Sequence, residues 1–413
     1  MRGFSRRPRG GQKPRVLFIL PNLSGGGAEK SLVTLLRVLG ERHGGGRDFD
    51  ADLFLFEKEG LFLQQVPPWV RVRSPGRRYT VFVGGWRKAL LYFLLCCRPD
   101  LLLARLRYRG FWQAPPQERP ALFWAALRCV LPHLRTEYDV AIAYLEGSAT
   151  YYCAEKVRAK QKIAFFHNDC RAFMAQRALD ERYFPAFDAI ASVSESCCDA
   201  LRMAFPDLAN RVCCVENIVF PDLLHQLAKE EAPPWEPSVI PTLLTIGRLS
   251  EQKGIDLAIR ACAILKQAGI PLRWYSIGKG ELEEPLRERI REEGLQEDFV
   301  LLGERANPYP ALAACDIYVQ PSRYEGKCIA LEEAKALARP IVTTRYGTVG
   351  NQIEEGVTGL LAEIDAASLA ETIRGLLEDG NLREELHENL LQMPTNVSEA
   401  GKFMDLLGFF PKP

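Results

Sequence analysis

Two glutamates, Glu325 and Glu333, are separated by seven residues in a stretch that follows a short apolar run. The first lies in a loop next to Gly326, and the second lies about two turns into an alanine- and leucine-rich segment that predicts a helix. A loop that leads into a helix N-terminus offers free backbone N–H groups to an anion. A carboxylate in the loop could accept sugar hydroxyls, and one on the helix could reach a ribose. Taken alone, two solvated helix glutamates would explain the same spacing.

Two basic residues follow the predicted strand at residues 242–246. Arg248 and Lys253 lie between two glycines, Gly247 and Gly254, at the start of a predicted helix. The carboxyl edge of a parallel sheet is where such folds bind ligands. Arginine offers phosphate oxygens a planar fork of donors, and lysine offers a point charge. The pattern therefore predicts a phosphate-binding edge.

The first half of the chain holds two weaker candidates. His167 ends an apolar run at residues 162–166, and a histidine at a strand end that faces a cleft is a site candidate, although a lone histidine is usually structural. Gly27 ends the glycine run before a predicted helix at residues 28–39. A Walker A loop needs glycine directly before Lys-Ser, and Glu29 stands there instead. What remains is a loop that lets a phosphate or an acceptor approach closely, and a simple strand-to-helix turn explains it equally well.

No metal site and no cofactor are expected. Asp48, Asp50 and Asp52 could hold a metal together with a nucleotide sugar, but we interpret them as a solvated polar loop before a strand. The five histidines are too dispersed for a zinc site.

The composition is that of a soluble globular protein with more than one domain. The chain has 413 residues, of which 47% are hydrophobic and 25% charged, which excludes disordered and fibrous classes. Its net charge is +1, but residues 1–225 carry 33 basic and 22 acidic side chains and the remainder carries 20 and 30. The basic first half is therefore expected to meet an anionic partner, and nothing points to nucleic acid.

Several features favour a cytoplasmic location. The twelve cysteines include no CxxC pair, so we expect reduced thiols. The first fourteen residues are basic and lack the apolar core of a signal peptide. The longest apolar stretch, residues 89–97, is too short to span a bilayer.

Alternating strand and helix patterns predict an α/β fold with two doubly wound, Rossmann-like domains that face each other across a cleft. A proline-rich linker is expected near residue 235. The expected divisions are a basic tail at 1–14, a first domain at 15–230, a second domain at 240–395, and a C-terminal helix at 396–413 that could cross back to the first domain.

Residues 71–112 combine basic and aromatic side chains. The basic residues are Arg71, Arg73, Arg77, Arg78, Arg87, Lys88, Arg98, Arg105, Arg107 and Arg109. Within this range only Asp100 opposes their charge. Such a mixture is typical of an interface with anionic lipid headgroups. A solvated basic face over an ordinary core would explain the same residues equally well. The charge of the first half favours peripheral association with the inner face of the cell membrane.

From Arg15 to about Glu378 the chain resembles the retaining glycosyltransferases of the GT-B class (glycosyl transferases group 1, family four). The motifs that carry this resemblance are at residues 25–29, 247–254, 324–334 and 356–360. Residues 139–169, with Tyr144-Leu145-Glu146-Gly147 and His167-Asn168-Asp169, resemble bacterial members that build surface polysaccharides.

The resemblance implies a role for each candidate residue. Residues matching Arg248 and Lys253 hold the donor diphosphate, and those matching Glu325 and Glu333 contact the donor sugar and the ribose. The residue matching His167 lies beside the reacting sugar. Gly27 would let the first-domain loop approach the donor, with Gly326 in the opposite loop. Lys327-Cys328 replaces the Phe-Pro of many relatives beside the sugar pocket, so the identity of the donor sugar stays open.

The resemblance implies a retaining glycosyltransferase that moves a sugar from a nucleotide-diphosphate sugar to a saccharide or lipid-linked acceptor. Its place would be cell-surface polysaccharide or glycolipid synthesis, and the leaving phosphate would take the acceptor proton during same-face attack. Two alternatives remain open. A nucleotide-sugar epimerase of the same architecture would convert the donor without an acceptor. A non-catalytic subunit of a glycosyltransferase complex would convert nothing.

Overall fold

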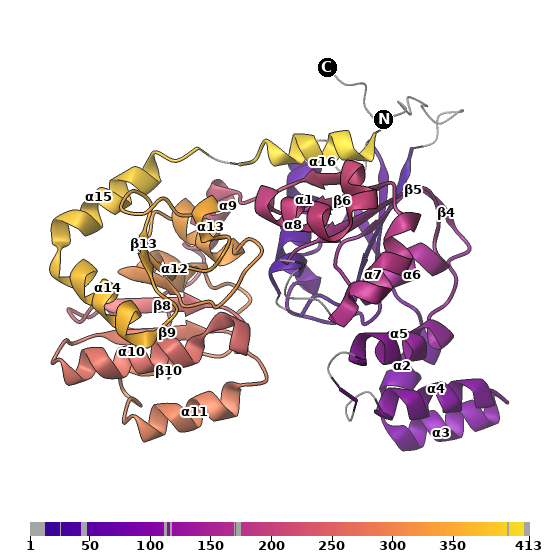
Figure 1. Cartoon of the computed structure of the whole chain (residues 1–413), viewed down its shortest axis with the longest axis horizontal. Coiled ribbons are helices and arrows are strands. Elements are labelled where there is room, and N and C mark those ends of the chain that lie inside the picture. Colours follow the sequence, from indigo (N-terminus) through magenta and orange to yellow (C-terminus); the bar gives the residue numbers. More distant parts are fainter. Residues whose placement is uncertain are drawn as a thin grey trace. The chain divides into compact units, whose positions relative to one another are not determined.

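The computed structural model describes residues 13–24, 26–42, 48–110, 114–115, 118–168, 170, 175–394 and 396–408. The chain forms two compact units (Figure 1). The first contains residues 28–216, the segment that ends at Ser24, and the segment that begins at Glu399. The second contains residues 25–27 and 217–398. Each unit is built on its own parallel sheet, as the alternating sequence pattern predicts.

The first unit contains a seven-stranded parallel sheet in the order β3-β2-β1-β4-β5-β6-β7. The strands are β1 (Arg15–Leu20), β2 (Asp50–Leu55), β3 (Val70–Arg73), β4 (Glu137–Ala143), β5 (Arg158–Phe166), β6 (Ala189–Ser192) and β7 (Val212–Cys214). The order reverses between β1 and β4, which pair directly with each other. Loops that follow the two strands at such a reversal diverge, and ligands bind between them in folds of this type.

Helices connect these strands and cover the sheet. Those of the first unit are α1 (Gly27–Arg42), α2 (Arg77–Val83), α3 (Trp86–Leu95), α4 (Pro99–Gly110), α5 (Arg119–Val130), α6 (Ser148–Lys156), α7 (Arg177–Tyr183), α8 (Glu195–Ala204) and α16 (Glu399–Leu407). Helices α2–α5 form one insertion between β3 and β4. Within this insertion α3 and α4 lie farthest from the sheet (Figure 1).

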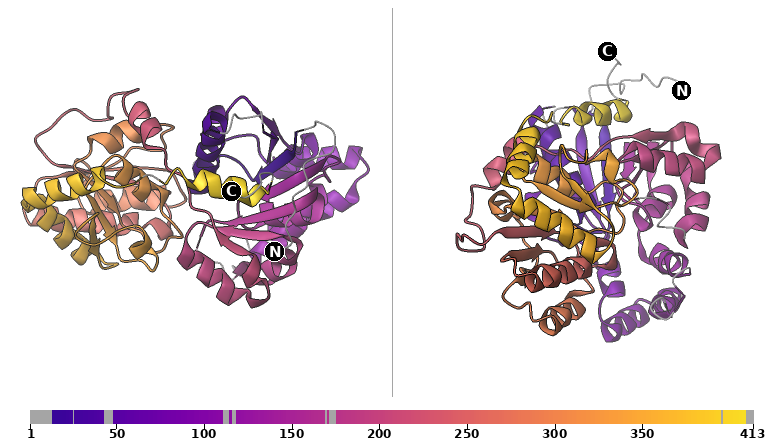
Figure 2. Two further views of the ribbon diagram at one scale, coloured as in Figure 1. Left: turned by 90° about the horizontal axis from the view of Figure 1, so that it is seen from above. Right: turned by 60° about the vertical axis from the view of Figure 1, so that its left-hand side comes forward.

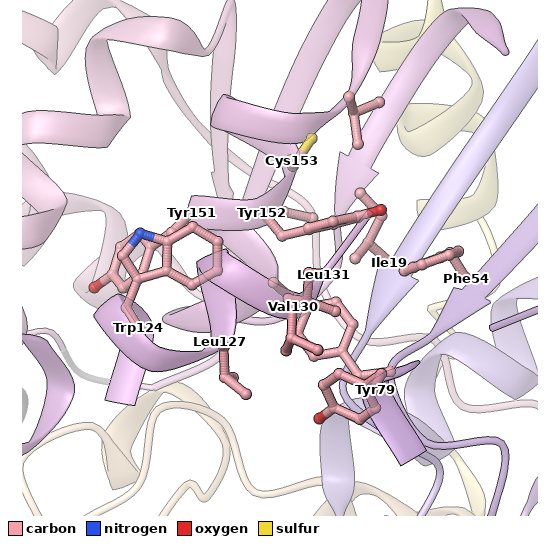
Figure 3. Close-up of a cluster of buried hydrophobic side chains, with 14 of the residues drawn as sticks. Ile19, Phe54, Tyr79, Trp124, Leu127, Val130, Leu131, Tyr151, Tyr152 and Cys153 are labelled. Carbon is pink, nitrogen blue, oxygen red and sulfur yellow. The ribbon is translucent and has the colours of Figure 1, made fainter. Parts of the chain in front are cut away.

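Aromatic side chains fill the space between the sheet and the helices of the first unit (Figure 3). Tyr152 from α6 stacks on Phe54 from β2, with ring centroids 5.1 Å apart. Trp124 from α5 is buried and donates a 2.8 Å hydrogen bond from its indole N–H to the hydroxyl of Tyr183. Burying aromatic rings contributes much of the stability of such a core, provided that their polar atoms find partners. Through Trp124, helix α5 thus ties the insertion to α7.

Helix α16 completes the first unit from the far end of the chain. Phe403 stacks on Phe18 of β1, with centroids 6.1 Å apart, and Gln161 of β5 donates to the carbonyl of Leu406 (3.2 Å). The Glu399 side chain accepts the backbone N–H of Glu216. Figure 2 shows the helix, in yellow, alongside the strands of this unit.

The second unit contains a six-stranded parallel sheet in the order β10-β9-β8-β11-β12-β13. The strands are β8 (Thr242–Ile246), β9 (Arg273–Ile277), β10 (Phe299–Leu301), β11 (Ile317–Gln320), β12 (Ile341–Thr344) and β13 (Leu360–Ala362). The helices are α9 (Pro221–Leu227), α10 (Ile255–Gln267), α11 (Glu283–Glu292), α12 (Tyr309–Ala314), α13 (Ile329–Ala336), α14 (Ala366–Glu378) and α15 (Gly380–Leu391). Here the strand order reverses between β8 and β11.

The proline-rich segment near residue 235 packs on the second unit. Trp235 stacks on Tyr275 of β9, with centroids 4.3 Å apart and ring planes 11° apart. The buried Leu224 of α9 belongs to the same apolar cluster as Tyr309. The division between the units therefore falls at Glu216, ahead of the residues that the sequence indicates as a linker.

Asp52 corrects one expectation, because it is not a solvated loop residue. It lies in β2, is buried, and forms ion pairs with Arg71 (3.3 Å) and Arg73 (2.9 Å) of β3. Tyr138 of β4 also donates to it at 2.7 Å. The charge of a buried carboxylate must be compensated in this way. Asp50 accepts from Arg71 at 3.5 Å, so two arginines of the expected basic surface are already neutralised.

Asp180 of α7 should make the stability of the first unit depend on pH. It is buried, accepts a 2.9 Å hydrogen bond from Tyr151, and burial raises its pKa to about 7. A raised carboxyl pKa contributes stability below the unfolded-state value of 3.8, and this contribution is lost as pH rises through about 7.

We expect Asp180→Asn to stabilise the protein at pH 8, by at most about 4 kcal/mol, and to have little effect near pH 4. Urea unfolding of the parent and the variant at both pH values checks this. An equal difference at the two pH values would contradict it.

Candidate functional site

The carboxyl ends of β8 and β11 bring together five of the residues that the sequence singles out. The two strands pair at Leu243 with Ile317, so the loops that follow them leave the same edge of the sheet at its reversal point. The loop after β8 carries Arg248 and Lys253. The loop and helix after β11 carry Glu325, Gly326 and Glu333.

Lys253 and Glu325 form an ion pair across the two loops. The ammonium nitrogen lies 2.5 Å from Oε1 of Glu325, and the two side chains are 19% and 6% exposed. Burial lowers the pKa of Lys253, but the Glu325 carboxylate outweighs burial and raises it above its ordinary value. Lys253 therefore keeps its positive charge in a nearly dry environment, where electrostatic contacts are strong.

The remaining partners of Glu325 fix its carboxylate. Ser322 donates to Oε1 at 2.6 Å and Gln252 donates to Oε2 at 3.3 Å. Ser322 is itself held by the side-chain amide of Gln320 at 2.8 Å. A carboxylate can accept about four hydrogen bonds. Among the described residues three donors are in place, which leaves one acceptor position on Oε2 without a donor.

Close backbone packing holds the two loops together. Gly254 has a φ of +65°, and a Cβ there would lie 1.9 Å from the carbonyl oxygen of Pro321. The N–H of Arg323 donates to the carbonyl of Gln252 at 2.8 Å, and its guanidinium binds Asp256 through two hydrogen bonds of 2.9 and 2.7 Å. Only glycine fits at residue 254, since both its conformation and its contact exclude a side chain.

Arg248 supplies a second cation at this edge. Its side chain is exposed and forms no hydrogen bond or ion pair with the part of the chain that the structure describes. The positive charge of Arg248 lowers the pKa of Lys253, although by less than Glu325 raises it. An uncompensated guanidinium beside a buried ammonium is a strong anion-binding arrangement.

Glu333 lies in α13 and faces inwards. It is buried and accepts a 2.9 Å hydrogen bond from the hydroxyl of Tyr309. Gln352, which the sequence did not indicate, brackets the start of this helix. Its amide accepts the N–H of Cys328 at 2.8 Å and donates to the Cys328 carbonyl at 2.9 Å. The two glutamates are thus rigidly placed constituents of the unit, not solvated helix residues.

His167 and Gly27 belong to other elements. Gly27 is the first residue of α1. His167 follows β5 in the first unit and is buried between the rings of Tyr144 and Phe165, with centroids 5.0 and 5.9 Å away. Neither ring nitrogen has a partner of full hydrogen-bond geometry among the described residues, although the backbone of Tyr144 lies near enough to raise the pKa of the ring slightly. Burial lowers its pKa to about 4, so the imidazole is neutral at pH 7. A buried polar group that is poorly satisfied is costly, so a ligand that reached these nitrogens could stabilise the ring.

Glu146 is a residue of this region that we did not select as a site candidate from the sequence. It is buried, accepts the backbone N–H of His167 at 3.1 Å, and accepts the side-chain amide of Asn168 at 2.5 Å. Burial raises the pKa of Glu146, whereas these hydrogen bonds lower it. Its signal in the sequence is its position just after β4, at the reversal point of the first sheet. Asp169 lies outside the described residues.

The structure contains no cluster of three or more histidine, cysteine, aspartate or glutamate side chains able to hold a metal among the residues it describes. Within the same residues, no helix combines the length and the apolar character needed to cross a bilayer.

Part of the second unit is similar in sequence to known proteins. Residues 234–393 match the family described as Glycosyl transferases group 1. The amylovoran biosynthesis glycosyltransferase AmsK of Erwinia amylovora is 37% identical over 165 residues, which cover 37% of each chain. An N-acetylgalactosaminyltransferase of Campylobacter jejuni that acts on a diphospho-undecaprenol-linked sugar is 33% identical over 34% of this chain and 39% of its own length. The matches thus span well under half of the length of these relatives.

Solved structures extend the similarity in fold to both units. HepE of Anabaena, solved with UDP-glucose, superposes with a TM-score of 0.64 over 96% of this chain and 100% of its own, at 18% identity. The sucrose-phosphate synthase of Thermosynechococcus elongatus gives the same TM-score over 95% of this chain and 98% of its own, at 16% identity. The chain therefore has the GT-B fold, and its residues 234–393 match the model of the glycosyl transferases group 1 family.

Proposed function

We propose that this protein is a glycosyltransferase that moves a sugar from a nucleoside diphosphate sugar to an acceptor. The observation that carries this proposal is the arrangement at the reversal point of the second sheet. There the exposed Arg248 stands beside the buried pair of Lys253 and Glu325. These residues lie in the segment that matches the glycosyltransferase family, and the structural neighbour HepE binds UDP-glucose.

Each charged group has a role in this reaction. Departure of the nucleotide places negative charge on the diphosphate, which Arg248 and Lys253 stabilise. Glu325 accepts hydroxyls of the donor sugar through its open lone pair, and Glu333 accepts those of the ribose. Neutral His167 contacts the sugar near the reacting face, and Gly27 and Gly326 allow backbone N–H groups to approach the donor. The reaction retains the anomeric configuration, with same-face attack and proton transfer to the leaving phosphate.

The acceptor is a saccharide or a lipid-linked saccharide of cell-surface polysaccharide or glycolipid synthesis. Two relatives support this choice by their described activities. AmsK acts in amylovoran biosynthesis, and the Campylobacter enzyme acts on an undecaprenol-linked sugar. Such an acceptor places the enzyme at the cytoplasmic side of a membrane.

A panel of nucleotide sugars tests the function directly. The correct donor should raise the melting temperature of the protein and, with an acceptor, yield a product whose anomeric configuration matches that of the donor by NMR.

Arg248→Ala should weaken nucleoside diphosphate binding by roughly 1.5–3 kcal/mol, because a charge-assisted contact is lost. Arg260→Ala, at an exposed position of α10, is the matched control. Conversion of the donor without any acceptor would instead identify an epimerase, and failure of every donor to bind would refute the proposal.

The reaction should need no resident metal, because Arg248 and Lys253 offset the charge of the leaving group. We expect activity to survive an excess of EDTA. Complete loss that Mn²⁺ or Mg²⁺ restores would contradict this expectation. Asp52 would then be a poor choice of ligand, since its carboxylate is occupied by Arg71, Arg73 and Tyr138.

A further inference from the structure

The outward faces of α3 and α4 carry leucines that are open to solvent. Between 38% and 76% of each side chain is exposed in Leu90, Leu91, Leu94, Leu95, Leu103 and Leu106. The two helices form a hairpin, because only residues 96–98 separate them. Single exposed leucines are ordinary on a soluble protein, but a group of them on one element marks an interaction surface.

These leucines are not needed to hold the hairpin together. Its inward face is already packed, since Phe93 of α3 and Leu101 of α4 are fully buried. Phe93 also lies edge-to-face against Phe82 of α2, with centroids 6.3 Å apart. The hairpin therefore has a buried core and carries six exposed leucines in addition.

Helices α2 and α3 carry cations that have no carboxylate partner among the described residues. Arg78, Arg87 and Lys88 are exposed and form no ion pair or hydrogen bond within the described ranges. Arg77 lies over the ring of Tyr92, 5.6 Å from its centroid. Asp100 is the single acidic residue between positions 77 and 110, and Arg98 neutralises it. The surface is therefore apolar and positively charged at once.

Exposed leucines together with unpaired cations favour one kind of binding partner. A second copy of the chain that docked through the same hairpin would cover the leucines but would bring the same cations together with no carboxylate to compensate them. An anionic bilayer offers phosphates to the cations and an acyl region to the leucines. We infer that the α3–α4 hairpin docks on an anionic lipid bilayer and inserts the leucines of α3 at the boundary between headgroups and acyl chains. Docking would give the enzyme access to a lipid-linked acceptor, and only this consequence rests on the proposed function.

Insertion of leucines can be separated from simple charge attraction. The parent protein should bind vesicles in which about a third of the lipid is phosphatidylglycerol, and should ignore pure phosphatidylcholine. The triple variant Leu91→Gln, Leu94→Gln, Leu95→Gln should bind the anionic vesicles at least about tenfold more weakly. Met203→Gln with Leu391→Gln, which are 83% and 63% exposed in the parent, is the control outside the hairpin and should bind as the parent does.

The charged residues have a matched control. Reversing Arg78, Arg87 and Lys88 to glutamate should abolish vesicle binding. Reversing Lys58, Arg135 and Arg158 changes the net charge by the same amount at exposed positions outside the hairpin, and should reduce binding far less. In about 1 M salt, where the Debye length is about 3 Å, the parent should keep part of its binding, whereas the leucine variant should release completely.

Cys96, at the tip of the hairpin, reports insertion depth. It is exposed, as are Cys97 and Cys129. With those two changed to serine, an environment-sensitive dye on Cys96 should shift to the blue on anionic vesicles and be quenched by a lipid-borne quencher. No vesicle binding by the parent, undiminished binding of the leucine variant, or a parent dimer that the leucine changes dissociate would each overturn the inference. A nucleotide sugar should raise the melting temperature of every variant as much as that of the parent. If no nucleotide sugar binds the parent, that result counts against the proposed function alone.

Discussion

Glu325→Gln is expected to lower the turnover of sugar transfer by at least about 100-fold while nucleoside diphosphate affinity is retained. The carboxylate is proposed to contact the sugar, so a neutral amide weakens the contact that orients the reacting centre. The amide also removes the charge partner of Lys253, which lies 2.5 Å away. Lys253 then faces the diphosphate without competition, and affinity for the nucleotide alone should not fall.

Steady-state kinetics and calorimetric titration with the nucleoside diphosphate separate these two effects. Glu363→Gln is the control, because Glu363 is an exposed glutamate of the same unit that pairs with Arg345 at 3.1 Å. Full activity of Glu325→Gln would show that the sugar site is elsewhere. Loss of nucleotide binding in the variant would show that Glu325 serves chiefly to hold Lys253 in place.

Gly254→Ala is expected to cost at least about 3 kcal/mol of stability and to abolish transfer. The added methyl would meet the carbonyl oxygen of Pro321 at 1.9 Å, in a backbone conformation with φ of +65°. Relief of that overlap must separate the loops after β8 and β11, and with them Lys253 and Glu325.

Gly294→Ala is a control for backbone strain alone. Gly294 has the same φ of +65°, but nothing lies within 4 Å of its virtual Cβ. It should cost only about 1–2 kcal/mol and leave transfer intact. Chemical unfolding and activity of the two variants check the comparison. Equal destabilisation by both substitutions would mean that the contact with Pro321 does not hold the loops together.

Much of the fold follows from local patterns in the sequence. The apolar run at residues 242–246 becomes β8 with the predicted bounds, and the run at residues 15–20 forms β1, because strands covered on both faces need continuous apolar sequence. The helix predicted to begin near Lys253 forms as α10, from Ile255 to Gln267, and Gly254 precedes it in the left-handed conformation. Strand-to-helix alternation then leaves little choice but two parallel sheets.

Contacts between distant residues could not be predicted in this way. Lys253 and Glu325 are 72 residues apart, and each alone resembles an ordinary charged side chain in a loop. Their pairing depends on β8 and β11 being neighbours, which no local pattern reveals. Asp52 was assigned to a solvated loop for the same reason, since its arginines come from β3 and its tyrosine from β4. No sequence pattern near Trp235 indicates that its ring stacks on Tyr275.

The order in which the polypeptide leaves the ribosome gives α16 a further significance. Residues 217–398, which make up most of the second unit, are all synthesised before the Phe403 that packs on Phe18. The nascent first unit must therefore wait, with the apolar surface beside Phe18 uncovered, while the second unit can already fold. Such exposed apolar surface makes folding intermediates prone to aggregation. Expression of residues 15–216 alone should accordingly give an insoluble product, which co-expression of a peptide spanning α16 should rescue.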